Sequence, residues 1–101
     1  MEKIINGKTY NTDTANKVGV YQYSHESDFT YVYEALYRTK KGQWFIYYEG
    51  GAMSKYAKPV GNNNVGGDRG IRLLDEAEVK EWMEQHADAE TYQTYFECEE
   101  G

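Results

Sequence analysis

The chain has 101 residues, of which 40% are hydrophobic and 28% are charged, and its formal net charge is −6. This length suits one domain, residues 1–101, with a single core, and the hydrophobic content excludes a disordered chain. No apolar run reaches the roughly 20 residues of a membrane-spanning helix, and the polar start argues against a signal peptide, so we expect a cytoplasmic protein with no membrane partner.

The beginning of the chain predicts a hairpin, a brief helix and a strand. Residues 3–10 contain Asn6-Gly7 between two apolar stretches, and Asn-Gly favours a two-residue type I′ turn because both positions need positive φ. Residues 12–19 are expected to form a short helix that ends at Gly19. Residues 20–23 then predict a strand.

The central stretch, residues 29–49, gives the strongest signal. Two runs of β-branched and aromatic residues flank Lys40-Lys41-Gly42, which predicts a hairpin with Gly42 left-handed in a three-residue loop. Side-chain alternation then defines two faces. A tyrosine-rich face, expected to be half exposed, contains Tyr31, Tyr33, Ala35, Tyr37, Phe45 and Tyr47. The opposite face, expected to meet the core, contains Val32, Leu36, Trp44, Ile46 and Tyr48.

The second half of the chain predicts a loop, a strand and two helices. Residues 61–70 are rich in glycine and asparagine and indicate an exposed, mobile loop. Residues 71–74 predict a short strand. Asp75 and Glu78 match a capping box, and the helix that follows should run to about His86. Its buried stripe should contain Val79, Trp82, Met83 and His86, and a second short helix, capped by Asp88, should turn Tyr92, Tyr95 and Phe96 inward.

These elements together predict an α+β fold. We expect an antiparallel sheet of about four to six strands, centred on the 29–49 hairpin, with the C-terminal helix packed on one face.

The charge of the chain is unevenly distributed. Residues 1–74 hold seven acidic and ten basic residues, a balance of +3, whereas residues 75–101 hold ten acidic residues and Lys80 alone, a balance of −9. One interpretation is a solvated face that keeps a small protein soluble. The other is a mimic of a phosphate backbone, which would bind a nucleic-acid-binding protein and not the nucleic acid itself.

Two surfaces are therefore candidates for a protein partner. The acidic candidate consists of Glu78, Glu81, Glu84, Asp88, Glu97, Glu99 and Glu100. The aromatic candidate, an alternative on the hairpin, consists of Tyr33, Tyr37 and Tyr47, because a tyrosine ring is apolar and its hydroxyl is polar.

Residues suited to catalysis or metal binding are sparse. Cys98 is the only cysteine, so an internal disulfide and a cysteine metal cluster are excluded. His25 and His86 have no partners at metal-ligand spacing. No nucleophile with a positioned base is visible. We expect neither an enzyme nor a cofactor.

Four segments carry a resemblance to small proteins of Gram-positive phages, plasmids and conjugative elements: INGKTYNTDTA, LYRTKKGQWFIYYEGG, AMSKYAKPVG and LLDEAEVKEWMEQH. The similarity spans residues 3–96, and some proteins of this kind are anti-CRISPR inhibitors directed at type II-A Cas9. The resemblance implies a non-catalytic inhibitor that acts in the bacterial host cell on a nuclease such as Cas9 or its guide complex. It carries over no set of functional residues. The alternative is a binding or assembly module of a mobile element, homodimeric through the tyrosine face, with no inhibitory role.

Overall fold

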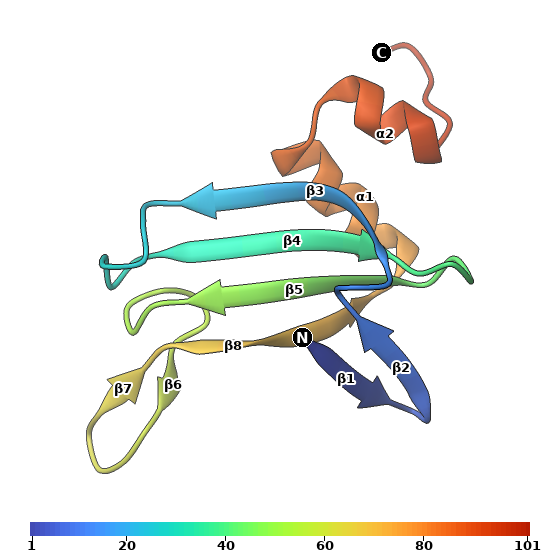
Figure 1. Ribbon diagram of the computed structural model, residues 1–101. Coiled ribbons are helices and arrows are strands. Elements are labelled where there is room, and N and C mark those ends of the chain that lie inside the picture. The colour runs from blue at the N-terminus through green and yellow to red at the C-terminus, as the bar shows by residue number, and fades with distance from the viewer.

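A computed structural model describes all 101 residues and shows an α+β protein built on one antiparallel sheet (Figure 1). The elements are β1 (Glu2–Ile5), β2 (Lys8–Asn11), β3 (Asn16–Tyr23), β4 (Val32–Arg38), β5 (Trp44–Gly50), β6 (Lys58–Pro59), β7 (Val65–Gly66), β8 (Asp68–Leu74), α1 (Glu76–His86) and α2 (Ala89–Tyr95). The main sheet has the order β3-β4-β5-β8, and β1-β2 and β6-β7 form two separate hairpins. The predicted fold class is confirmed.

The central hairpin has the predicted register. Tyr37 lies opposite Phe45, and Leu36 lies opposite Ile46. Gly42 has a φ of +86°, the left-handed conformation that the three-residue loop requires. The first strand is shorter than expected and begins at Val32, because the preceding residues form a turn in which the Asp28 carboxylate accepts a hydrogen bond from the Thr30 amide at 2.8 Å.

The N-terminal hairpin is also confirmed, and it covers part of the tyrosine-rich face. Asn6 and Gly7 both have positive φ, 52° and 75°. The hairpin places Tyr10 against Phe45, with ring centroids 5.7 Å apart. A second core therefore forms on this face from Tyr10, Ala35, Tyr37, Phe45 and Ile71. The expectation of a half-exposed face is wrong at this end of the sheet, because the β1-β2 hairpin excludes water from it.

The brief helix expected over residues 12–19 is not formed. Residues 12–14 turn, and residues from Asn16 onward belong to β3, which pairs with β4. Pairing along β4 outweighs a weak local helix signal. Gly19 does not end a helix; it lies beneath Trp82, where an added Cβ would sit 3.3 Å from the indole ring. Gly19 is therefore explained by the close approach of Trp82 and not by the end of a helix.

The loop expected over residues 61–70 is shorter than predicted. Its second part forms β7 and the start of β8, which leaves residues 61–64 as an exposed turn. Gly67 passes so close to β5 that a Cβ would lie 2.3 Å from the Gly50 carbonyl oxygen. Glycine is therefore required here by the approach of two backbones, and its presence does not indicate a flexible spacer.

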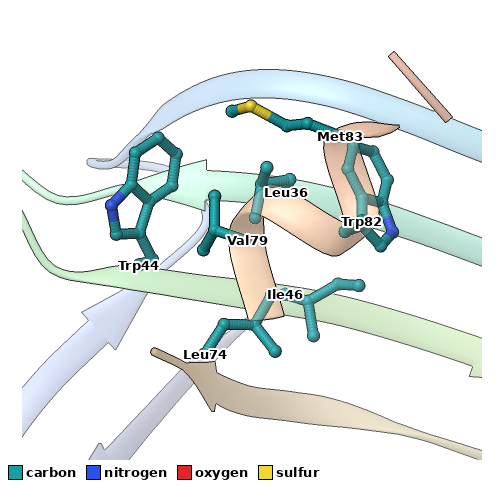
Figure 2. Packing of buried hydrophobic residues seen from close by; sticks show 7 residues of the cluster. All are labelled: Leu36, Trp44, Ile46, Leu74, Val79, Trp82 and Met83. Atoms are coloured by element: carbon teal, nitrogen blue, oxygen red, sulfur yellow. The ribbon is translucent and has the colours of Figure 1, made fainter. Parts of the chain in front are cut away.

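The C-terminal helices pack on the face opposite the N-terminal hairpin. Asp75 and Glu78 form the predicted capping box, and Val79, Trp82 and Met83 are buried. Figure 2 shows how these three side chains of α1 meet Leu36, Trp44, Ile46 and Leu74 of the sheet. The side chains of Tyr92, Tyr95 and Phe96 pack against the same cluster, as predicted. Neither helix combines the length and the apolar character needed to cross a membrane.

Candidate functional site

The seven predicted acidic contact residues are all exposed on residues 75–101, which we call the acidic segment. Four of them, Glu84, Asp88, Glu97 and Glu99, line one groove of about 600 Å³ that also includes Met83 and Tyr92. Glu78, Glu81 and Glu100 do not line this groove. The structure thus gathers part of the predicted set around the junction of α1, α2 and the C-terminal residues.

Two of these carboxylates also act in helix capping. Glu78 accepts one hydrogen bond from the Asp75 amide at 3.1 Å and another from Arg72 at 2.9 Å. The Asp75 amide and Arg72 lower the pKa of Glu78. Asp88 caps α2 through the Thr91 amide at 2.8 Å, and this bond lowers the pKa of Asp88. Both residues hold helix ends, so they are less free to meet a partner than Glu81 and Glu84.

Few carboxylates of the acidic segment have a cation nearby. Of its ten acidic residues, only Glu76 and Glu78 form ion pairs, with Lys80 and Arg72. Eight exposed carboxylates are left without an internal cationic partner. Like charges gathered on one surface repel each other and raise the local negative potential, which attracts a basic surface.

The aromatic candidate lies at the other end of the tyrosine-rich face, beyond the N-terminal hairpin. A groove of about 640 Å³ is lined there by Tyr31, Tyr33, Tyr37, Tyr47, Glu49 and Arg69, among others. The rings of Tyr33 and Tyr47 meet edge to face at 6.2 Å. Glu49 accepts hydrogen bonds from the hydroxyls of Tyr47 and Tyr31. Burial and this carboxylate raise the pKa of both tyrosines, so both stay neutral donors.

The three predicted tyrosines are not equivalent. Tyr33 and Tyr47 are partly exposed, whereas Tyr37 is only 7% exposed and stacks on Phe45 with a centroid separation of 5.1 Å. Tyr37 therefore belongs mainly to the second core. A partner on this face would meet Tyr33 and Tyr47 first.

One buried carboxylate was not predicted from the sequence. Glu34, which is 1% exposed, lies on the helix-covered face of β4. Its oxygens accept hydrogen bonds from the Trp82 indole at 3.0 Å and from the Tyr56 hydroxyl, and Lys55 pairs with it at 2.7 Å. The sequence does contain a signal for its burial, because side-chain alternation places Glu34 between Val32 and Leu36 on the core face of the strand.

The Glu34 cluster joins three parts of the chain. Trp82 comes from α1, Tyr56 and Lys55 come from the turn after β5, and Glu34 comes from the sheet. Burial alone would raise the pKa of Glu34, but the hydrogen bonds from Lys55, Tyr56 and Trp82 outweigh it and lower the pKa. The carboxylate is thus ionised and enclosed. This arrangement is suited to fixing α1 on the sheet and offers no open side to a substrate.

The histidines lie apart from any cluster of ligands. His86 stacks on Tyr21 with centroids 3.8 Å apart, and burial lowers its pKa. His25 lies in a turn and contacts Ser27 at 2.6 Å. No group of three or more histidine, cysteine or acidic side chains is arranged to hold a metal ion.

Comparison with protein-family models, with curated proteins and with solved structures finds no match for this chain.

Proposed function

We propose that this chain is a non-catalytic inhibitor that binds a nuclease such as Cas9, alone or with its guide RNA, and blocks nucleic-acid binding or cleavage. The observation that supports this function is the set of eight exposed carboxylates on the acidic segment that have no cationic partner within the protein. A nuclease that binds nucleic acid presents a basic groove, and this groove attracts such a surface as it attracts phosphates.

The packing of the acidic segment favours this role. The stripe of Val79, Trp82 and Met83 fixes α1 on the sheet, so the orientation of Glu81 and Glu84 is set before a partner arrives. A rigid surface loses less conformational entropy on binding than a flexible tail. The acidic side chains of α1 are therefore better suited to fill a basic groove than an unstructured run of the same charge.

The first experiment reverses two charges that have no structural role. Glu81 and Glu84 are exposed and form neither a capping bond nor an ion pair, so E81K/E84K should fold normally. We expect this variant to lose at least about tenfold in inhibition of DNA cleavage by a Cas9–guide complex, because each close charge pair across an interface contributes about 1.5 kcal/mol or more. Glu78 is left unchanged because it closes the capping box.

A matched control reverses the same number of charges elsewhere. E2K/D13K alters two exposed acidic residues of the N-terminal region and should inhibit like the unmodified chain. Wild-type potency of E81K/E84K at low salt would exclude the acidic segment as the contact surface.

A second candidate function is a binding or assembly module that uses the tyrosine groove and does not inhibit. The observation that favours it is the partly exposed pair Tyr33 and Tyr47 in a groove of about 640 Å³. Under this function Y33S/Y47S abolishes association, as measured by light scattering after size exclusion, and E81K/E84K has no effect. Tyr37 is kept because its loss would damage the second core.

A further inference from the structure

Two adjoining grooves are lined by residues of the β4-β5 turn and of the segment from the β1-β2 hairpin to the start of β3. Their volumes are about 390 Å³ and 510 Å³, and they share Thr14, Ala15, Thr39 and Lys40 in their lining. Arg38 lines the first groove, and Lys8 and Lys41 line the second. We call this surface, defined by Lys8, Arg38, Lys40 and Lys41, the basic corner.

The charge of the basic corner is uncompensated. None of its four cations takes part in the ion pairs of the protein. No acidic residue lines either groove, although the chain has 17 acidic residues and only 11 basic ones. If the charged residues were distributed at random over an acidic protein, a surface with four basic residues and no acidic ones would not be expected. The grooves therefore present a local positive potential toward an anion.

Arg38 is held in a fixed orientation within this surface. Its guanidinium lies over the rings of Trp44 and Tyr95, 5.1 Å and 5.6 Å from their centroids. Its Nε is buried and has no hydrogen-bond partner. A buried donor without an acceptor is costly. Stacking on aromatic rings leaves the edge of the guanidinium free to bind a planar or bidentate anion.

The backbone of the β4-β5 turn passes close to the guanidinium of Arg38. Gly42 is left-handed, and an added Cβ would lie 3.6 Å from a terminal nitrogen of the Arg38 guanidinium. Thr39 lines both grooves, and its hydroxyl oxygen accepts a hydrogen bond from the Gln43 amide, which leaves the hydroxyl proton free to bind an anion. The Thr14 hydroxyl, by contrast, donates to the Asn11 carbonyl. An arginine fork, lysine ammonium groups and hydroxyls together are the donors that bind phosphate oxygens.

We infer that the basic corner binds consecutive phosphate groups of a nucleic-acid strand. Two grooves in series, one with Arg38 and one with Lys8 and Lys41, can hold neighbouring phosphates, and Lys40 lies between them. This inference changes the sequence-based expectation of no direct nucleic-acid contact, because the net charge of −6 hides a local cationic surface. None of the acidic residues of the acidic segment lines either groove, so failure of this site would leave the proposed function standing.

The test measures binding of a short fluorescein-labelled single-stranded RNA to the full chain by fluorescence anisotropy, from about 50 to 200 mM salt. The main variant, K40Q/K41Q, alters two exposed turn residues. We expect weaker binding and a salt slope smaller by about 1.4, since each single-strand phosphate contact contributes about 0.7. The matched control, K58Q/R69Q, removes two exposed cations outside the basic corner and should keep most of the salt slope.

The variant R38K keeps a positive charge at this position but removes the planar guanidinium, so it tests whether binding needs the geometry of arginine or only its charge. We expect it to bind the strand more weakly than the unmodified chain, and circular dichroism checks that it folds. Unchanged binding by K40Q/K41Q, or an equal loss in K58Q/R69Q, would overturn the site. Binding of inorganic tripolyphosphate without binding of RNA would overturn the assignment to a strand, and equal displacement by polyglutamate would show a site for acidic protein.

Discussion

At the scale of single residues, Glu34 determines how the two layers join. A carboxylate that is 1% exposed is stable as an ion only when hydrogen bonds replace its lost hydration. Trp82, Tyr56 and Lys55 provide them. The same bonds orient the indole of Trp82 and hold the turn after β5 against the sheet. One buried polar group therefore sets the position of two otherwise separate segments.

Replacement of Glu34 by leucine should destabilise the fold by about 2–5 kcal/mol, because the Trp82 indole and the Tyr56 hydroxyl would each lose an acceptor at a cost of about 1–3 kcal/mol. Urea denaturation followed by circular dichroism measures the change. E34Q is the matched control, since an amide oxygen still accepts one bond. A loss below about 1 kcal/mol for E34L would show that the cluster contributes little.

The pH dependence of stability gives an independent test of the same cluster. The pKa of Glu34 in the folded protein lies below its ordinary value of 4.5. Its ionised form therefore stabilises the fold above pH 4.5, and this contribution is lost as the pH falls through the lower, folded-state pKa. We expect the stability difference between the wild type and E34Q to shrink over that range. A difference that stays constant as the pH falls would contradict the pKa shift.

At the scale of elements, α1 closes the main core. Its stripe of Val79, Trp82 and Met83 covers the sheet residues shown in Figure 2. We expect W82A to cost about 3–5 kcal/mol, because it leaves a large cavity. W82F keeps an aromatic ring in the core and loses the bond to Glu34 and part of the contact with Gly19, so it should cost less. Urea melts that show a change below about 1 kcal/mol for W82A would place this side chain outside the core.

Sequence periodicity was sufficient to predict the elements whose signal is local. The Asn6-Gly7 turn, the register around Gly42 and the capping box of Asp75 and Glu78 depend on neighbours in sequence. The 3.6-residue period predicted three buried residues of α1 correctly, Val79, Trp82 and Met83. His86, predicted in the same stripe, is only partly buried because it lies at the end of the helix and stacks on Tyr21. The sequence predicted that Glu84, Asp88 and Glu97 would be exposed, but it did not predict that they would line one groove.

Features that depend on distant parts of the chain were not predictable in the same way. β3 forms because residues 16–23 find a partner in β4, and this pairing is stronger than the local helix signal. The second core depends on Tyr10 reaching Phe45 across the sheet. The basic corner requires the β1-β2 hairpin and the β4-β5 turn to meet, and Lys8 and Lys40 are far apart in sequence.

At the scale of the whole molecule, charge is separated between a +3 body and a −9 acidic segment. If the acidic segment makes the contact with a nuclease, inhibition should weaken steeply as salt rises from about 50 to 200 mM, because the screening length falls to about 8 Å near physiological salt. The measurement is a cleavage assay repeated at several salt concentrations. E81K/E84K should be weak at all of them. Salt-independent inhibition would contradict a contact made by the acidic segment.

The position of α1 in the chain has a consequence for synthesis. All four strands of the main sheet precede α1 in sequence, so the ribosome makes the sheet before the helix that covers Leu36, Ile46 and Leu74. Until residues 76–86 emerge, this apolar face has no cover and is open to chaperones or to another nascent chain. A message cut short before codon 76 would yield a sheet with one bare side, which is an aggregation hazard. Residues 76–86 belong to the acidic segment, so part of the segment that gives the protein its net negative charge also completes its fold.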